Sequence, residues 1–451
     1  MNKEVITQSN YKDLPLLFKS LQGIENNGVV VELTSRISEI PKFSDVVPFL
    51  YQLLDQEEFF GVWLKNVPFC TISQNAHDHI IRNKEKIKGE KKKECQACKF
   101  FKECCGFPQG YFKKYGTSEI KPIADIPEEI MIELESRCNF KCQFCFNKIS
   151  FAAKGRNIKQ LSPNYVKRVI DSAKKAGIKI VRFTGGEPLL YPEIVEMMKY
   201  AKGKSVEVRL NTNGSLINFK TARKFKGIVD NILIPIESWS NANEEKITGF
   251  KDALKKKIEA VKLLKNVNIP VVRIGTVATK ENIRNFQKIY DLVKSLPVDE
   301  WELYRPVSAS SELDKKDIKI LVSKIIEARK NTNILISIAN AIPFCSIKDI
   351  NGINSISSGA LYDEGHTRIV VDPRGFTKPH YFIDKNIGDP LDILSAWNHP
   401  FMKKMRNLKF LPKNCKKCNF RYKCRGGSRH MAYLASGKYK NPDPLADYGN
   451  C

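Results

Sequence analysis

The chain has 451 residues, of which 42% are hydrophobic and 27% are charged, and these values are typical of a folded globular protein with more than one domain. No apolar run approaches the roughly 18–20 residues that cross a bilayer, and the first residues lack the apolar core of a signal peptide, so we expect a cytoplasmic protein without a membrane span. The net charge of +26 comes mainly from lysine spread along the chain, which favours a solvated surface over a nucleic-acid-binding one. Lys255, Lys256 and Lys257, for example, are expected to form a solvated helix face.

Residues 1–125 are predicted to form an N-terminal α/β domain. Short apolar runs predict strands at 29–32 and 59–64, and helical periodicity predicts a helix at 43–54 between them. These three elements make a small β-α-β unit. A lysine-rich stretch with several cysteines follows it.

Thirteen cysteines in a chain expected in the cytoplasm indicate metal sites rather than disulfide bonds. In the N-terminal domain, three of them are spaced C-x2-C-x5-C and a fourth lies upstream. The residues predicted to bind metal here are Cys70, Cys95, Cys98 and Cys104, with Cys105 as an alternative to Cys104. Four thiolates fit either a zinc ion or an iron–sulfur cluster, and the spacing leaves both open.

Residues 126–306 are predicted to form a second domain, in which strands and helices alternate as in a parallel sheet. The strands are expected at 130–135, 178–183, 205–211, 230–236, 270–277 and 299–304. Ser162 and Pro163 are favourable residues for the start of the first helix. The polar motifs of this domain all follow predicted strands, at the end where the active sites of such barrels lie.

The first of these motifs is a loop in which Cys138, Cys142 and Cys145 are spaced C-x3-C-x2-C. Three thiolates hold three irons of a four-iron cluster and leave one iron without a protein ligand, as a catalytic metal site requires. A zinc site is the alternative, but it needs a fourth ligand, and the nearest histidines, His79 and His366, are far away in the sequence.

This loop resembles the signature of the radical S-adenosylmethionine (SAM) superfamily, in which an aromatic residue, here Phe144, precedes the third cysteine. A Gly-Gly-Glu-Pro sequence about forty residues later strengthens the resemblance. The resemblance implies a partial (β/α)6 TIM-like barrel, a [4Fe-4S] cluster on the three cysteines, and reductive cleavage of SAM to a 5′-deoxyadenosyl radical. It also implies a reductant such as flavodoxin or ferredoxin.

The same resemblance implies a set of residues near SAM. The Gly-Gly-Glu-Pro loop is expected to contact the SAM amino group, and the turns after the third and fourth strands are expected to approach the rest of the cofactor. The residues expected at the cofactor are Phe144, Gly185, Gly186, Glu187, Pro188, Asn213, Glu237 and Ser238. Arg273 and Thr276, on the fifth strand, are either adenosine contacts or core residues.

Residues 307–451 are predicted to form a third domain. Its expected elements are a helix near 315–330, a strand near 333–339, a glycine- and serine-rich loop, a hairpin at 367–384 and a helix at 393–408. The last cysteines resemble half of the SPASM extension of radical SAM enzymes, which implies a SPASM/twitch-like domain with an auxiliary [4Fe-4S] cluster. The expected ligands are Cys415, Cys418, Cys424 and Cys451, with zinc as the alternative occupant.

The other auxiliary site of that extension has lost most of its ligands here. His380 and Ser428 stand where the extension has cysteines, and only Cys345 remains. The resemblance therefore does not assign a catalytic base to this chain. Tyr304, Asp372 and Asp384 are only weak candidates for a catalytic acid or base. Tyr304 and Arg305 end the sixth strand and are expected to face the substrate.

The family resemblance implies an enzyme that abstracts a hydrogen atom from its substrate. The SPASM-like segment favours a peptide or protein, as in the modification of ribosomally made peptides or the maturation of an enzyme. The alternative substrates are RNA and a small-molecule or haem-like cofactor precursor. A non-catalytic scaffold is disfavoured, because it would have no use for an open iron.

Overall fold

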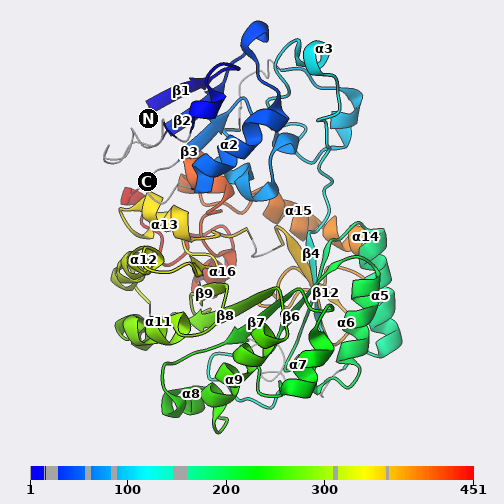
Figure 1. The fold of residues 1–451 in the computed structure, drawn as a ribbon, viewed down its shortest axis with the longest axis vertical. Helices are drawn as coiled ribbons and strands as arrows, with labels where there is room; N and C mark the ends of the chain where they lie inside the picture. The colour runs from blue at the N-terminus through cyan, green and yellow to red at the C-terminus, as the bar shows by residue number, and fades with distance from the viewer. Residues whose placement is uncertain are drawn as a thin grey trace. The chain divides into compact units, whose positions relative to one another are not determined.

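The computed structural model describes residues 2–14, 16, 29–55, 62–82, 89–145, 160–307, 313–361 and 365–450. The chain, drawn as a ribbon in Figure 1, divides into two compact units, Met1–Asp125 and Ile126–Cys451. Each unit has its own hydrophobic core. Within the described ranges, no helix is both long enough and apolar enough to cross a membrane.

The first unit, blue to cyan in Figure 1, contains a parallel sheet of three described strands in the order β1-β2-β3. The strands are β1 (Asn2–Ile6), β2 (Val29–Leu33) and β3 (Val62–Lys65), and the helices are α2 (Phe43–Asp55) and α3 (Tyr111–Tyr115). The predicted helix at 43–54 and the strand at 29–32 are confirmed. Of the predicted strand at 59–64, residues 59–61 lie outside the described ranges and the rest belongs to β3. β1 was not predicted, because only two of its five residues are apolar.

In the described part of the second unit, nine strands form one sheet in the order β10-β9-β8-β7-β6-β5-β4-β11-β12. Its central six strands are parallel neighbours in chain order, which confirms the predicted series of βα units. They are β4 (Glu129–Glu133), β5 (Ile180–Thr184), β6 (Glu207–Asn211), β7 (Asn231–Pro235), β8 (Val271–Val277) and β9 (Glu300–Tyr304). The helices between them are α5 (Pro163–Lys175), α6 (Ile194–Gly203), α7 (Phe219–Phe225), α8 (Asn241–Thr248), α9 (Ala253–Asn266), α10 (Lys280–Arg284) and α11 (Phe286–Lys294).

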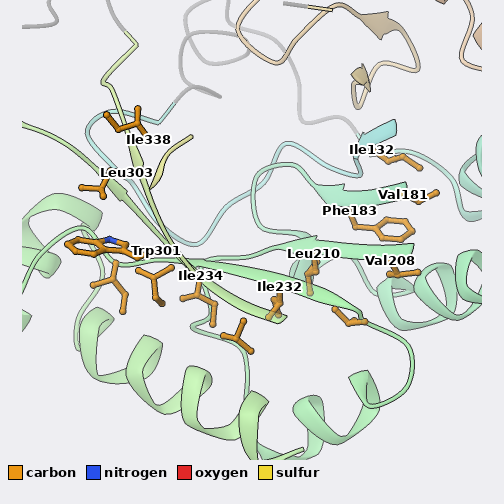
Figure 2. Packing of buried hydrophobic residues seen from close by; sticks show 14 of the residues in the cluster. Ile132, Val181, Phe183, Val208, Leu210, Ile232, Ile234, Trp301, Leu303 and Ile338 are labelled. Atoms are coloured by element: carbon orange, nitrogen blue, oxygen red, sulfur yellow. The ribbon is translucent and has the colours of Figure 1, made fainter. Parts of the chain in front are cut away.

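The two faces of this sheet differ in polarity because side chains alternate along each strand. One face carries apolar residues that pack against the helices, and Figure 2 shows Leu210, Ile232 and Ile234 on this side. The alternate residues include charged side chains, such as Glu129 and Arg182, which are buried and paired with each other at 2.7 Å. The apolar face therefore supplies the core, while the polar face and the strand ends are left for chemistry.

Residues 307–451 fall within the second unit and extend its sheet at both edges. After α12 (Lys315–Arg329), β10 (Leu335–Ile338) pairs with β9. At the other edge, β11 (Arg368–Val371) pairs in parallel with β4, and β12 (Thr377–Lys378) completes the predicted hairpin.

Three predictions for this segment were wrong or incomplete. The single helix predicted at 393–408 is two helices, α14 (Ile393–Trp397) and α15 (Pro400–Arg406), because Pro400 cannot donate a backbone hydrogen bond and starts a new helix instead. The glycine- and serine-rich loop contains α13 (Ile350–Ile356), capped by the side chain of Asp349. Finally, α16 (Arg429–Ser436) follows the last cysteine run and was not predicted.

Candidate active site

The C-x3-C-x2-C loop follows β4 and lies at the carboxyl end of the parallel strands. Cys138 is exposed, and Cys142 and Cys145 are half-buried, as is Phe144. Partial desolvation of the thiols by the surrounding atoms raises the pKa of Cys138 to about 11 and that of Cys142 to about 12, so their thiolates need a positively charged partner such as iron. Across the described ranges, no three Cys, His, Asp or Glu side chains are arranged to hold a single metal ion.

The Gly-Gly-Glu-Pro loop after β5 lies directly against this cysteine loop. Gly186 donates its backbone N–H to the carbonyl of Glu135 at 2.8 Å, and Glu187 donates to the carbonyl of Arg137 at 2.8 Å. Gly185 has a φ of 139°, and a Cβ there would come within 2.6 Å of the Glu135 oxygen. A Cβ on Gly186 would overlap the Arg137 carbonyl. The two glycines are therefore required by the close approach of the two loops.

The side chain of Glu187 ties this loop to the next strand. It is buried, and one of its oxygens accepts from the Thr212 hydroxyl at 2.5 Å while the other accepts from the backbone N–H of Asn213 at 2.7 Å. The backbone N–H of Leu189, beside the buried Pro188, also donates to it at 3.0 Å. Burial raises the pKa of Glu187 to about 7, although these donors oppose the shift. Sequence reasoning did not single out Thr212, since only the fold brings it to Glu187.

Asn213 connects the turn after β6 to the cysteine loop. Its side-chain amide donates to Asn139 at 2.8 Å and lies 4.0 Å from the sulfur of Cys138. Asn139 in turn donates to the hydroxyl of Ser215 at 2.9 Å. The structure therefore brings the cysteine loop, the Gly-Gly-Glu-Pro loop and the turn after β6 into one hydrogen-bonded group.

Glu237 and Ser238 follow β7 at the same end of the sheet. Glu237 accepts from the backbone N–H of Val277 at 2.8 Å, and burial together with the nearby Glu244 raises its pKa to about 7. The hydroxyl of Ser238 is buried and has no hydrogen-bond partner in the described structure. A buried hydroxyl without a partner is uncommon and indicates a place for a polar ligand atom.

Two residues of β8 have structural partners. The hydroxyl of Thr276 donates to the carbonyl of Ile236 at 2.7 Å and accepts from the indole of Trp301 at 2.9 Å. Arg273 donates to Glu302 at 2.6 Å and to Asn231 at 2.7 Å. These contacts favour the reading of both residues as part of the core.

The three weak candidates for an acid or base also have partners within the chain. Tyr304 donates to Glu302, and its burial beside that carboxylate raises its pKa well above the ordinary value. Arg374 pairs with both Asp372 and Asp384, the latter at 2.5 Å. The two carboxylates are thus held by one guanidinium in the turn of the β11–β12 hairpin, which favours a structural role.

The expectation of a solvated face at Lys255, Lys256 and Lys257 was wrong for one residue. Lys257 is buried, pairs with Glu244 at 2.5 Å and lies over the ring of Phe140 in the cysteine loop. Lys255 and Lys256 are exposed, as expected. Nothing in the run of lysines distinguishes the buried one, apart from its position on the apolar stripe of the helix.

The remaining cysteines form two separate groups, each around a small cavity. One cavity, in the first unit, is lined by Cys70, Cys95, Cys98 and Cys104, and Cys105 does not line it. The other, in the second unit, is lined by Cys345, Cys415, Cys418 and Cys424. Cys451 lies outside the described residues, whereas Cys345, which the sequence left alone, has joined the C-terminal group.

Residues 132–293 match the family model described as the radical SAM superfamily. The relatives include PqqA peptide cyclase of Granulibacter bethesdensis, which is 22% identical over 334 residues, or 70% of this chain and 86% of that protein. They also include AdoMet-dependent heme synthase of Methanosarcina barkeri, which is 22% identical over 348 residues, or 72% of this chain and 98% of that protein.

Solved structures share the fold. Streptococcus suis SuiB bound to precursor peptide SuiA superposes with a TM-score of 0.57 at 17% identity, over 74% of this chain and 78% of SuiB. Native anSMEcpe with bound AdoMet superposes with a TM-score of 0.55 at 18% identity, over 69% of this chain and 93% of anSMEcpe. The likeness confirms the predicted α/β partial barrel.

Proposed function

The chain belongs to the radical SAM superfamily of enzymes, which use a [4Fe-4S] cluster and SAM, and we propose that it modifies a peptide or protein by hydrogen abstraction. The observation that carries the proposal is the contact between the C-x3-C-x2-C loop and the Gly-Gly-Glu-Pro loop. Two backbone hydrogen bonds hold these loops together at the carboxyl end of the sheet, where the active sites of such barrels gather.

The residues at this place fit a cluster and SAM. Three cysteines on a loop with no fourth cysteine match a cluster with one open iron. The unpartnered hydroxyl of Ser238 offers a hydrogen bond to a polar atom of a ligand at the end of β7. Glu187, by contrast, uses both carboxylate oxygens within the chain, and so orders the loop beside the cysteines.

When bound, the cluster and SAM supply a 5′-deoxyadenosyl radical that removes a hydrogen atom from the substrate. Cys138, Cys142 and Cys145 would hold the cluster, and Asn213 keeps the loop at Cys138 in place through its contact with Asn139. Gly185 and Gly186 let the backbone of the neighbouring loop approach the backbone of Glu135 and Arg137, directly before the first cysteine. A reductant of the flavodoxin or ferredoxin class and a cytoplasmic location belong to this proposal.

The substrate class is supported by the names of the relatives. PqqA peptide cyclase and SuiB, whose structure contains a precursor peptide, both point to a peptide. AdoMet-dependent heme synthase favours the second candidate, a haem-like precursor. PqqA peptide cyclase of Granulibacter bethesdensis and the heme synthase of Methanosarcina barkeri are both 22% identical to this chain over the matched residues. The substrate is therefore to be identified by experiment.

The experiment combines dithionite-reduced enzyme, SAM and an extract of the source cells under anaerobic conditions, followed by mass spectrometry. We expect 5′-deoxyadenosine, methionine and a peptide or protein whose mass has changed. The variant Cys138→Ala/Cys142→Ala/Cys145→Ala is the control and should give none of them. A changed tetrapyrrole with unchanged peptides would support the second candidate, and 5′-deoxyadenosine formed by the triple variant would contradict the assignment of the cysteines.

A further inference from the structure

The chain contains the same cysteine arrangement twice. Pro68-Phe69-Cys70 precedes C-x2-C-x5-C in the first unit, and Pro343-Phe344-Cys345 precedes C-x2-C-x5-C in the second. A glycine with positive φ follows the last cysteine in both, Gly106 at 73° and Gly426 at 76°. A chance recurrence of one spacing does not explain a shared Pro-Phe-Cys sequence and a shared left-handed glycine.

The backbone of the two arrangements is also the same. Each Pro-Phe-Cys sequence enters a 3-10 turn, and each later cysteine is held by the same backbone hydrogen bond. In the Pro-Phe-Cys turn, the bond from Thr71 N to Pro68 O (3.1 Å) corresponds to that from Ser346 N to Pro343 O (3.0 Å). Within C-x2-C, the bond from Cys98 N to Cys95 O (3.0 Å) corresponds to that from Cys418 N to Cys415 O (3.3 Å). At the last cysteine, the bond from Cys104 N to Phe100 O corresponds to that from Cys424 N to Phe420 O (2.8 Å in both). These bonds pair Cys70 with Cys345 and Cys104 with Cys424.

Aromatic residues and sulfur contacts follow the same pairing. The ring of Phe69 stacks on Phe100 at 4.1 Å, and the ring of Phe344 contacts Phe420 at 5.8 Å. The backbone N–H of Phe344 donates to the sulfur of Cys424 at 3.4 Å, and that of Phe69 bonds to Cys104. Cys105 is equivalent to Arg425, which is not a thiol.

The supporting elements correspond as well. In the first unit, β2, α2 and β3 lead to Cys70, and in the second unit β9, α12 and β10 lead to Cys345. Both pairs of strands are parallel neighbours. After each turn the chain returns to the preceding strand through an isolated parallel bridge, Leu64 with Ile80 and Ile338 with Ser357. The repeat therefore covers the last barrel strand β9, the following α12 and β10, and the cysteine segment.

We propose that the first unit is a second copy of the module that ends the larger unit, and that each copy holds its own [4Fe-4S] cluster. The ligands are Cys70, Cys95, Cys98 and Cys104 in the first and Cys345, Cys415, Cys418 and Cys424 in the second. Cys345 thus takes the place expected for Cys451, and Cys104 is chosen over Cys105.

The cavities favour a cluster over zinc. In each copy the four thiols line a space, and among the described residues no three of them are arranged to hold a single metal ion. A single zinc ion binds each sulfur at about 2.3 Å and so draws all four together, whereas a cluster fills the space and places each thiolate on a different iron. With four protein ligands neither cluster has an open iron, so neither binds SAM as the loop at Cys138 does. The proposal does not rest on the radical chemistry or on the substrate.

The first experiment measures iron, zinc and acid-labile sulfide in the full chain after anaerobic reconstitution, together with Mössbauer spectra. We expect about twelve irons, four at each of three sites. The double variant Cys95→Ser/Cys98→Ser should lose about a third of the iron, and the control Cys105→Ser should lose none. Stoichiometric zinc in the unchanged chain, or an equal loss of iron in the control, overturns the assignment of the first unit. Even if the double variant does not fold, the iron and zinc contents of the unchanged chain distinguish a cluster from a zinc ion in the first unit.

The second experiment compares Cys345→Ser with a chain from which Cys451 is deleted. Cys345→Ser should lose one cluster or shift the electron paramagnetic resonance spectrum of the reduced protein, while the deletion should leave iron content and spectrum unchanged. Loss of a cluster on deletion of Cys451, with the Cys345→Ser spectrum unchanged, overturns the equivalence of Cys345 with Cys70. Each variant changes only one residue of the chain. A general defect in folding would therefore appear as a loss of iron from all three cysteine groups, not from one.

Discussion

One buried ion pair, between Lys257 and Glu244, joins two helices to the cysteine loop. The side chains are 1% and 0% exposed, their charged atoms are 2.5 Å apart, and Glu244 also accepts from the backbone N–H of Glu237 at 2.9 Å. Lys257 also lies over Phe140 and opposes the rise in the pKa of Cys142 that burial causes. The lysine therefore compensates a buried carboxylate and places a positive charge near the cluster loop.

Lys257→Met should destabilise the larger unit by about 3–5 kcal/mol, because it leaves Glu244 buried without its counter-charge. The matched control is Lys256→Met on the same helix, where the side chain is exposed and the expected change is within about 0.5 kcal/mol. Urea unfolding of the full chain measures both. Equal midpoints for the two variants would show that Glu244 finds another partner.

Glu237→Gln should change how stability depends on pH. Because the pKa of Glu237 in the folded chain, about 7, lies above its ordinary value of 4.5, the folded chain binds the proton more tightly. The resulting stabilisation is complete below about pH 4.5 and is lost as the pH rises through 7. The amide does not titrate, so the variant should gain relative to the unchanged chain by up to about 1.4 kcal/mol per pH unit in this window. Urea unfolding without SAM at pH 5, 6 and 7 measures the difference, which should not stay constant.

At the scale of loops and strands, the site depends on the approach of the Gly-Gly-Glu-Pro loop to the cysteine loop. Gly186→Ala should separate the two, since its Cβ would overlap the carbonyl of Arg137. We expect at least about a tenfold loss of SAM cleavage, the change that follows a cost of about 1.4 kcal/mol or more in the transition state. Formation of 5′-deoxyadenosine by reduced enzyme measures it.

The control is Gly203→Ala at the end of α6, where a Cβ meets no atom within 4 Å. This variant should cleave SAM at the unchanged rate and should be as stable or slightly more stable. A Gly186→Ala chain with full activity would mean that the cysteine loop moves aside without affecting the cofactors.

The elements and the site differ in how far local sequence determines them. The six strands of the barrel follow from their apolar runs, and the cysteine loop and Gly-Gly-Glu-Pro follow from spacing within a few residues. The contacts that buried polar residues make around these motifs do not follow from local sequence. Thr212 reaches Glu187, and Lys257 reaches Glu244, only through tertiary packing. Cys345 was left alone for the same reason, since about seventy residues separate it from Cys415. The hairpin at β11 was predicted, but not its pairing with β4.

At the scale of the whole chain, the three cysteine groups should be independent. The triple variant Cys138→Ala/Cys142→Ala/Cys145→Ala should lose about a third of the iron of the reconstituted chain, four of about twelve, together with all SAM cleavage. Iron analysis and chromatography of 5′-deoxyadenosine measure the two losses on one sample. Loss of all iron would mean that the other two clusters need the first for their assembly.

The pairing of β11 with β4 has a consequence for how the chain is made. Lys378 pairs with Glu133 at 3.0 Å across 245 residues, and β11 completes the edge of the first barrel strand. On the ribosome, that edge stays unpaired until most of the protein has been synthesised, and such distant contacts slow folding. The described strands of the first unit all lie within residues 2–65, so its sheet can form long before then. Synthesis therefore separates the assembly of the two units in time, with the smaller one complete while the sheet of the larger one still waits for its last strands.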